Sequence, residues 1–423
     1  MRAGLKHTNL KRFGKRLLAA ASTAGLSLLL LSCGASNTVD YLYVTSNLLN
    51  PGQINVYEVD SESGALKQIA DSPYPSGGRN PVDEVAAPSG KYLYVANHDD
   101  NTIVQFAIGT DGKLYPQTTT TTPGTEPVAL AINSSGTALY VLDYYAPAAP
   151  GQPSFTDLNP GPGALIAYPL NTGGTLGTPL SVGTANYFPV QCFPTNLTIT
   201  PNGNFVYVTN TNAVVVTTSP PVTGTVPILP ASCPASGTIS AFSVSASAVA
   251  PVPGSPFSTG ASSEPTGIIA DPGNGSIYVT DSRLNQLYTF SIQSSGALSL
   301  AATAGTGTMP MGGTIITNTS SGKYLYVTNY TDGSISIYSL SSGAPSLITT
   351  SSAGSSGPLC VLADPETQRF LYTSDYIGGT IGGAELNPSA GTLVSNQGSP
   401  YISSGQPTCV AAVTHPGGNK NGL

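Results

Sequence analysis

The sequence of 423 residues has no tryptophan, only three methionines and three histidines, and charged residues make up just 8% of the chain. Helical periodicity is absent between its apolar runs, which excludes an architecture of alternating strands and helices. There is also no zinc-ligand spacing, phosphate-binding loop or nucleophile elbow, so we expect no metal and no cofactor. The 48 glycines and 36 prolines, with regular apolar ladders, are typical of a turn-rich β protein.

A short segment of aromatic and β-branched residues recurs seven times. The copy Tyr324–Asn329, YLYVTN, follows a polar turn and ends at an asparagine, which is the composition of a buried strand between turns. The copies begin at Tyr41, Tyr92, Ala138, Phe205, Ser276, Tyr324 and Phe370. A period of about 45–50 residues is the signature of a repeat array.

Each copy has similar neighbours in the sequence. A proline with a short apolar run lies upstream, and a second apolar ladder lies downstream, as at Ile103, Phe106 and Ile108. A Gly-x-Leu turn and a short outer strand follow in most copies, for example at Gly112–Leu114. Four short strands in each repeat are the content of one propeller blade. The sequence therefore predicts an all-β protein, a seven-bladed β-propeller of four-stranded blades over residues 38–418.

The first repeat lacks its innermost strand, because the copy at Tyr41 follows the N-terminal leader almost directly. Residues 406–416 match the upstream half of a repeat and then stop. We expect this C-terminal segment to supply the innermost strand of the first blade and to close the ring without a covalent bond, with residues 419–423 as a tail. Closure removes the exposed strand edges of an open array.

Residues 1–32 are predicted to be a cleaved lipoprotein signal peptide. Six basic residues precede the apolar run Leu17–Leu31, which is short for a membrane span and typical of a signal-peptide core. The run ends in Leu-Leu-Ser-Cys-Gly at residues 30–34, which resembles the lipobox of bacterial lipoprotein signals and implies a lipid on Cys33. An ordinary signal peptide with a chance cysteine is the alternative. We expect residues 33–37 to form a lipidated tether that anchors the protein to a membrane on the extracytoplasmic side of the cell envelope.

The remaining chain is acidic. The leader holds six of the 14 basic residues and none of the 21 acidic ones, so eight basic residues remain and the net charge is −13. Such a chain offers no basic surface to nucleic acid, and it disfavours a heavily anionic substrate. A glycan or a protein is the expected type of partner.

Four cysteines follow the leader, in a compartment that permits disulfides. Cys192 precedes the inner strand of the fourth blade and Cys233 lies in the long loop of that blade, so a bridge would pin the loop. Cys360 and Cys409 occupy equivalent positions on inner strands that closure makes neighbours. A bridge between them would lock the ring, and two buried thiols are the alternative.

Two long loops depart from the repeat. They span residues 144–163 and 211–237, each between the second and third strands of adjacent blades, so both should stand over the same rim of the propeller. Long loops on a rigid scaffold often carry function, although surface insertions also drift at little cost in stability. Aromatic residues at the start of the first loop, Tyr144 and Tyr145, suit sugar rings or a protein partner.

The repeated Tyr-Val-Thr-Asn and the run PSGKYLYV at residues 88–95 resemble the YVTN-repeat propellers and the wider seven-bladed lactonase family, which includes the bacterial 6-phosphogluconolactonase type. The resemblance covers about residues 38–418 and implies the propeller fold. Enzymes of that family place a histidine just after a proline that opens an inner strand. The matching positions here hold no histidine, so the family's acid–base residue cannot be transferred to this chain.

A smaller group of candidates remains at the mouth of the central channel. Arg79 and Glu126 lie beside the prolines that open inner strands, and His98 lies in a loop expected on the same face. A lactone hydrolase could use His98 or a carboxylate as general base and Arg79 to stabilise the oxyanion. Glu264 and Arg283 are further candidates for ligand binding on this rim. Solvated rim charges are the alternative interpretation, because no spacing forces these groups together.

Six second strands end at an aspartate or asparagine in equivalent positions. Such a ring of oxygens resembles a calcium site, but hydrogen bonds to the following turn explain it more simply. Two classes of function stay open on the sequence. The sequence favours the first, an extracytoplasmic binding or interaction module that uses one face and its two long loops, because the family's histidine is missing. The alternative is a lactonase-like hydrolase at the channel mouth that acts on a neutral lactone or a sugar lactone.

Overall fold

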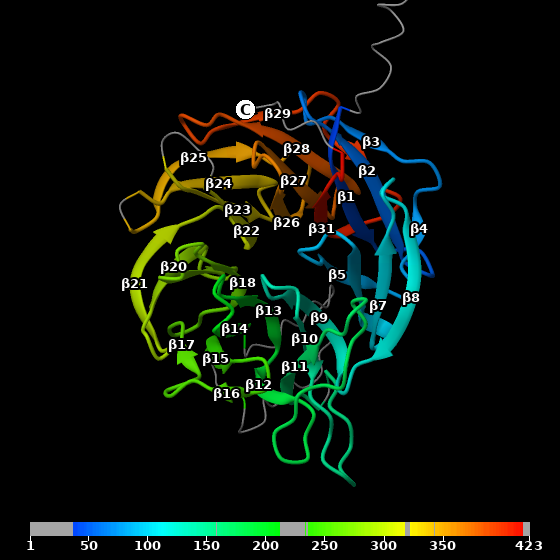
Figure 1. The fold of residues 1–423 in the computed structure, drawn as a ribbon. Helices are drawn as coiled ribbons and strands as arrows, with labels where there is room; N and C mark the ends of the chain where they lie inside the picture. The colour runs from blue at the N-terminus through cyan, green and yellow to red at the C-terminus, as the bar shows by residue number, and fades with distance from the viewer. Residues whose placement is uncertain are drawn as a thin grey trace, which may run out of the picture.

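The computed structural model describes residues 37–157, 159–211, 233, 236–317, 322–341 and 343–417. The predicted signal peptide, Cys33, the C-terminal tail and most of the loop 211–237 lie outside these residues. Seven antiparallel sheets surround a central axis and form a closed ring (Figure 1). The chain is therefore a seven-bladed β-propeller, as its repeat predicted.

The first four blades contain the following elements, given from the axis outward. Blade 1 contains β31 (Pro407–Thr414), β1 (Thr38–Ser46), β2 (Gln53–Asp60), β3 (Leu66–Gln68) and β4 (Tyr74–Pro75). Blade 2 contains β5 (Pro81–Ala86), β6 (Tyr92–Asn97), the 3-10 helix η1 (His98–Asp100), β7 (Thr102–Ile108) and β8 (Leu114–Thr121). Blade 3 contains β9 (Thr125–Ile132), β10 (Ala138–Tyr145), β11 (Pro162–Pro169) and β12 (Phe188–Cys192). Blade 4 contains β13 (Pro194–Ile199), β14 (Phe205–Asn210), β15 (Thr238–Val244), β16 (Val249–Pro251) and β17 (Phe257–Ser258).

The other three blades complete the ring. Blade 5 contains β18 (Pro265–Ala270), β19 (Ser276–Asp281), β20 (Gln286–Ile292) and β21 (Leu298–Gly305). Blade 6 contains β22 (Pro310–Ile316), β23 (Tyr324–Asn329), β24 (Ser334–Ser339) and β25 (Ser346–Ser352). Blade 7 contains β26 (Pro358–Ala363), β27 (Phe370–Asp375), β28 (Thr380–Leu386), β29 (Leu393–Ser395) and β30 (Tyr401–Ile402).

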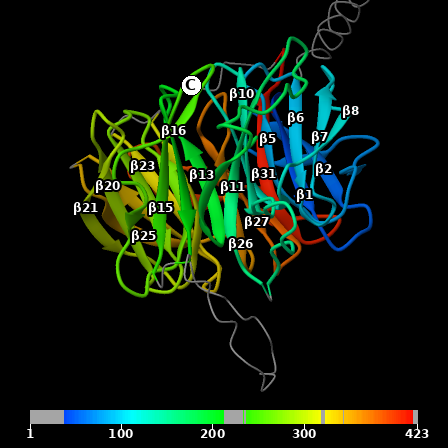
Figure 2. The same ribbon diagram turned by 90° about the horizontal axis from the view of Figure 1, so that it is seen from below.

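The two ends of the propeller meet in blade 1. Strand β31 pairs antiparallel with β1, with Tyr41 opposite Val413 and Thr45 opposite Cys409. Figure 2 shows β31 beside β1 within the ring. The predicted closure by residues 406–416 is thus present, and it satisfies the edge of β1 that would otherwise be open.

The second strand of each blade is an unbroken apolar run because neighbouring blades cover both of its faces. In β6, Leu93 and Val95 pack with blade 1, whereas Tyr94 and Ala96 pack with blade 3. All four side chains are fully buried. Alternation along a strand sends successive side chains to opposite faces, so burial on both faces requires a continuous apolar sequence.

The second tyrosine of the repeat joins each blade to the next at five of the seven interfaces. Its hydroxyl donates a hydrogen bond to the carbonyl of the glycine in the next blade's Gly-x-Leu turn. The first aromatic residue of the repeat packs against the same glycine, so closely that a Cβ atom on the glycine would overlap the aromatic ring. We call this arrangement the tyrosine–glycine contact. The bonds are Tyr43 to Gly112 (3.1 Å), Tyr94 to Gly174 (2.6 Å), Tyr207 to Gly296 (2.9 Å), Tyr326 to Gly391 (2.8 Å) and Tyr372 to Gly64 (2.8 Å). The aromatic rings are those of Tyr41, Tyr92, Phe205, Tyr324 and Phe370.

Hydroxyl groups near the axis also connect neighbouring blades. The threonine of the Tyr-Val-Thr motif reaches the next inner strand, with Thr280 Oγ1 2.7 Å from the carbonyl oxygen of Met311 and Thr328 Oγ1 3.0 Å from that of Leu359. At the ring closure, Thr408 donates to the carbonyl of Pro81 at 2.9 Å. The repeated residues are therefore structural, because their polar groups satisfy backbone acceptors between blades.

In blades 1, 4 and 7 the outer strand is broken into two short pieces, whereas the sequence predicted one continuous outer strand in each blade. A serine hydroxyl accepts a hydrogen bond from the third strand at each break, with oxygen–nitrogen distances of 2.8 to 2.9 Å. The serines are Ser72, Ser255 and Ser399, and their partners are the N–H groups of Val56, Ala241 and Gly383. Disulfides join Cys192 to Cys233 and Cys360 to Cys409. The second of these links the inner strands of blades 7 and 1.

Candidate functional site

One end of the ring, here called the mouth face, is where the chain passes from blade to blade and from each second strand to the third. Two kinds of residue alternate around this end: the one before each inner-strand proline, and the one after each second strand. Backbone hydrogen bonds hold them together, as from His98 N to Asn80 O (3.0 Å) and from Tyr376 N to Gly357 O (2.8 Å). The repeat therefore delivers a variable pair of side chains from each blade to the channel mouth.

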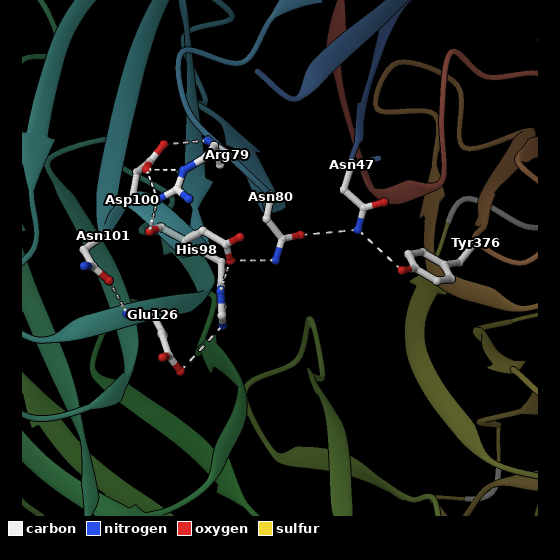
Figure 3. Close-up of polar contacts among 9 residues, drawn as sticks. Asn47, Arg79, Asn80, His98, Asp100, Asn101, Glu126 and Tyr376 are labelled. Atoms are coloured by element: carbon white, nitrogen blue, oxygen red, sulfur yellow. Dashed lines mark hydrogen bonds and ion pairs between the residues drawn. The ribbon is translucent and has the colours of Figure 1, made fainter. Parts of the chain in front are cut away.

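His98 and Glu126 meet at this mouth (Figure 3). His98 Nε2 lies 3.8 Å from Glu126 Oε2, and His98 Nδ1 lies 2.8 Å from Asp99 Oδ1. The helix η1 carries His98 and Asp99, whereas Glu126 belongs to β9 of the next blade. Asn101 accepts a hydrogen bond from Glu126 N at 2.7 Å, which fixes the backbone of Glu126 in its left-handed conformation (φ 59°). Asp99 thus holds one ring nitrogen and leaves the other facing Glu126.

The surroundings of the two carboxyl groups differ. Burial raises the pKa of Glu126, and the nearby His98 offsets part of that rise. Burial also acts to raise the pKa of Asp99, but hydrogen bonds from Asn80 and His98 outweigh it and lower the pKa. Asp99 is therefore held ionised, as a partner for Nδ1–H, whereas Glu126 takes up a proton more readily than an exposed glutamate.

Arg79 does not join this pair directly. Its Nε donates to Asp100 Oδ1 at 2.7 Å and its Nη2 donates to the carbonyl of Asp99 at 2.9 Å. The backbone N–H of Arg79 donates to Asp100 Oδ2. These bonds lower the pKa of Asp100, so the guanidinium charge faces an ionised partner. Of the three predicted catalytic residues, the structure brings His98 and Glu126 together, and Arg79 braces the loop that carries His98.

Amide side chains extend the site across blades 7, 1 and 2. Asn80 Nδ2 donates to Asp99 Oδ1 at 3.0 Å, and Asn47 Nδ2 lies 3.3 Å from Asn80 Oδ1 and 3.4 Å from the Tyr376 hydroxyl. We call the chain of residues from Tyr376 to Glu126 the polar arc (Figure 3). A hollow of about 270 Å³ adjoins it, lined by Asn47, Leu48, Leu49, Asn50, Arg79, Asn80, Asp99, Tyr376 and Gln406. Sequence reasoning missed Asn47, Asn80 and Tyr376, although their positions in the repeat, beside the inner proline or after the second strand, place them at the mouth.

Glu264 and Arg283 form a separate pair in blade 5. Arg283 Nη1 lies 3.0 Å from Glu264 Oε1, and the arginine side chain is 56% exposed. The backbone N–H of Arg283 donates to Asp281 at 3.0 Å. The pair therefore lies two blades beyond Glu126 on the same rim.

The two tyrosines expected to bind a ligand have different environments. Tyr145 is buried, and its hydroxyl donates to Asp157 at 2.9 Å, so it holds the loop that follows β10. Tyr144 packs edge-on against Tyr145 and also contacts Phe193. Tyr144 lines a cavity of about 310 Å³ on the channel axis, together with Thr195, Met311 and Cys360. Tyr144 therefore reaches the channel, and Tyr145 offers no exposed ring.

Two adjacent carboxyl groups of β5 were not identified from the sequence. Asp83 Oδ2 accepts a hydrogen bond from Leu130 N at 2.7 Å, and Glu84 Oε1 accepts one from Thr45 N at 3.1 Å. Burial raises the pKa of Asp83 to about 7 and that of Glu84 well above its usual range. Each group reaches a different neighbouring blade, so together they brace β5 between blades 1 and 3.

The ring of aspartates and asparagines that ends the second strands is structural. Asp281 accepts bonds from the following turn, as predicted. Asp143 and Asn329 instead accept from Gly124 N and Gly307 N, which belong to the segment entering the same blade. Within the described residues, no group of three or more histidine, cysteine, aspartate or glutamate side chains could hold a metal ion. In the same part of the chain, no helix has the length and hydrophobicity needed to cross a membrane.

Comparisons with known proteins bear on this site. A 6-phosphogluconolactonase of Formosa agariphila is 37% identical over 76 residues, a match that spans 18% of this chain and 21% of that relative. Among solved structures, the periplasmic gluconolactonase PpgL of Pseudomonas aeruginosa is similar, with a TM-score of 0.68 and 17% identity over 90% of this chain and 100% of that one. A Bacteroides uniformis protein described as a candidate 6-phosphogluconolactonase has a TM-score of 0.66 and 17% identity, over 89% of this chain and 100% of that one. At these identities the structural likeness establishes the fold.

The family profile described as "Lactonase, 7-bladed beta-propeller" matches residues 35–145, 232–358 and 278–407. These segments cover more than half of the chain and include the residues of the polar arc. The chain belongs to the lactonase family of seven-bladed β-propellers.

Proposed function

We propose that this protein hydrolyses an uncharged lactone at the channel mouth, with His98 as the general base. The observation that carries the proposal is the arrangement of Asp99, His98 and Glu126, in which one carboxylate orients Nδ1 of the imidazole and Nε2 lies 3.8 Å from the second carboxyl group. A base oriented by a second group is the usual arrangement for activating water. Membership of the lactonase family supports the same chemistry.

The proposed reaction uses the polar arc as follows. His98 Nε2 takes a proton from water while the water oxygen bonds to the lactone carbonyl carbon. Asp99 and Glu126, which lie on either side of the ring, then stabilise the positive charge of the imidazolium. The tetrahedral intermediate collapses with cleavage of the ring carbon–oxygen bond, and His98 returns its proton to the alkoxide, which gives the hydroxy acid. Asn80 Nδ2 donates one of its two hydrogens to Asp99, so the second hydrogen can donate to the oxyanion and stabilise it.

The charge distribution supports an uncharged substrate. Arg79 is occupied by Asp100 and Arg283 by Glu264, so both arginines identified at the mouth already face a carboxylate. A phosphorylated sugar lactone needs unpaired cations, which bind phosphate oxygens through charge-assisted hydrogen bonds. The amides of the polar arc are suited instead to hydroxyl groups.

The test compares glucono-1,5-lactone with its 6-phosphate in a pH-stat assay. The proposal predicts turnover of the uncharged lactone and at least tenfold lower kcat/KM for the phosphate ester. The variant His98→Gln should lose about 10²- to 10⁴-fold in kcat, which is the usual contribution of a general base. Glu126→Gln should lose less, because it removes only the charge beside the imidazolium.

His415→Gln is the matched control, since His415 lies after β31 on the opposite face and packs against Tyr41. It should retain full activity. Equal activity of the His98→Gln variant and the unaltered protein would exclude His98 as the base. Absence of turnover with a panel of uncharged lactones would exclude the hydrolase itself.

The second candidate is a binding module for an uncharged glycan at the same mouth. The hollow of about 270 Å³ beside the polar arc favours it, because four amide side chains line it, those of Asn47, Asn50, Asn80 and Gln406. Binding that is lost in Asn80→Ala and Gln406→Ala without any turnover by the unaltered protein would favour this function over hydrolysis.

We also propose that a lipid on Cys33 anchors the propeller outside the cytoplasmic membrane. The basic head, the apolar run and the lipobox-like residues 30–34 support this location. Cys33→Ser should move the protein to the soluble fraction and abolish labelling by a fatty-acid probe. Membrane association without labelling in the unaltered protein would contradict it.

A further inference from the structure

The interface between blades 3 and 4 lacks the tyrosine–glycine contact. Tyr140 occupies the position of the donating tyrosine, but Ala138 stands where five other blades have the first aromatic residue. The turn between β15 and β16 of blade 4 consists of Ser245–Ala248 and contains no glycine. Within the part of the chain that the structure describes, the Tyr140 hydroxyl forms no hydrogen bond. The first aromatic residue and the acceptor glycine are thus both missing at this interface, whereas the donor tyrosine remains.

A cavity of about 400 Å³ occupies the place of the missing contact. It lies on the face opposite the mouth, because its walls are the turns between first and second strands and between third and fourth strands. The Tyr140 ring, Leu180 and Val244 supply its apolar surface, and Asn202, Asn204 and Ser245 supply polar groups. Its volume falls within the range of roughly 300–1,000 Å³ that is usual for small-molecule sites.

At the interface between blades 5 and 6, which also lacks the tyrosine–glycine contact, charged side chains meet instead. Ser276 replaces the first aromatic residue there, but Lys323 and Asp271 form an ion pair across the interface. Between blades 3 and 4, by contrast, no charged side chain lines the cavity among the described residues. Its free polar groups are the Tyr140 hydroxyl, the Asn204 amide and Nδ2 of Asn202, whose Oδ1 already accepts from Thr200 and from Asn204 N.

We propose that this cavity binds an uncharged saccharide ring. A sugar ring presents apolar C–H faces and a rim of hydroxyl groups, which match the tyrosine ring and aliphatic side chains on one side and the amides and hydroxyls on the other. An anionic ligand would find no cation among the lining residues. The site lies on the face opposite the polar arc and rests on no part of the function proposed there.

Binding is tested with the methyl glycosides of glucose, galactose, mannose and N-acetylglucosamine, and with glucuronate as the anionic comparison. Saturation-transfer NMR and calorimetry are suitable, because the chain has no tryptophan for fluorescence. At least one glycoside should bind, and glucuronate should bind at least tenfold more weakly. Tyr140→Phe should weaken binding about tenfold through loss of one hydrogen bond. Ala246→Trp, at an exposed turn position, should fill the cavity and abolish binding.

Tyr94→Phe provides the matched control. It removes the same hydroxyl from an intact tyrosine–glycine contact, so it should leave glycoside binding unchanged and lower Tm by a few degrees, whereas Tyr140→Phe should leave Tm unchanged. The proposal is overturned if none of the four glycosides binds, if glucuronate binds as well as they do, or if binding survives Ala246→Trp. Loss of binding in His98→Gln would also overturn it by placing the ligand at the mouth.

Discussion

The junction between blades 7 and 1 and the interface between blades 3 and 4 are built from equivalent positions of one repeat, yet the first is held far more firmly. At the junction, Tyr372 and Asn396 both donate to the carbonyl of Gly64, and Phe370 packs against that glycine. Strand pairing of β1 with β31 and the disulfide Cys360–Cys409 add to these contacts. Between blades 3 and 4 the corresponding tyrosine has no acceptor among the residues that the structure describes, and a cavity remains.

The difference follows the connectivity of the chain. Blades 3 and 4 are consecutive, so a short link through Phe193 keeps them together even where their packing is loose. Blade 1, by contrast, is assembled from the two ends of the chain, since β1 and β31 lie more than 300 positions apart, and the entropy of closing so long a loop has to be offset by contacts. A propeller can therefore tolerate a binding cavity between consecutive blades more readily than at its closure.

The largest effect is expected from removing the closing strand. Deletion of residues 406–423 removes β31, exposes the edge of β1 and leaves Cys360 without its partner. We expect loss of cooperative unfolding and aggregation, measured by calorimetry and light scattering. Deletion of residues 419–423 alone is the control and should change neither. A truncated protein that stays monodisperse with an unchanged Tm would show that the closure contributes little.

The next effect concerns a buried carboxyl group at the same junction. Asp40 of β1 is fully buried, and the carboxyl group of Asp364 in blade 7 lies beside it. Burial, together with repulsion from Asp364 and Glu366, raises its pKa from 3.8 to about 8. The folded state therefore binds a proton that the unfolded chain releases above pH 4, so this group makes stability fall as pH rises from about 4 to 8.

Asp40→Asn should remove that dependence. We expect the variant to gain on the order of a few kcal/mol in unfolding free energy at pH 8 and little at pH 4, measured by urea denaturation. Asp60→Asn is the contrasting control, because hydrogen bonds from Ser63 and Glu62 outweigh burial and lower the pKa of Asp60. Its replacement should reduce stability at pH 8. If the difference in unfolding free energy between the Asp40→Asn variant and the unaltered protein stays constant from pH 4 to 8, the raised pKa of Asp40 is contradicted.

The smallest effect distinguishes the two interfaces at the level of one hydroxyl group. Tyr372→Phe should cost about 1 kcal/mol in unfolding free energy, since it removes a buried hydrogen bond to Gly64. Tyr140→Phe should cost close to nothing, because its hydroxyl has no partner within the described residues. Urea titrations at one pH compare the two variants directly. Equal losses would mean that the Tyr140 hydroxyl contributes to the interface after all.

The architecture was predictable because each of its determinants is local or periodic. Seven copies of one strand give the number of blades, and unbroken apolar runs such as Leu93–Val95 show that both faces of the strand are covered. The excess of second strands over first strands identified the segment that became β31. The breaks in three outer strands were missed, because they depend on serine side chains that replace ladder bonds.

The site was only partly predictable. The sequence placed Arg79, His98 and Glu126 at one end of the ring, since the repeat delivers equivalent positions to the same face. Only the tertiary structure decided that His98 faces Glu126 while Arg79 faces Asp100, because these choices depend on side-chain geometry across two blades. The same holds for Tyr140, which is present as in the other copies, although Ala138 replaces the aromatic residue that usually stands two positions before it. Its partner is missing in another blade, about 100 residues away, and no local pattern reports a contact that fails to form.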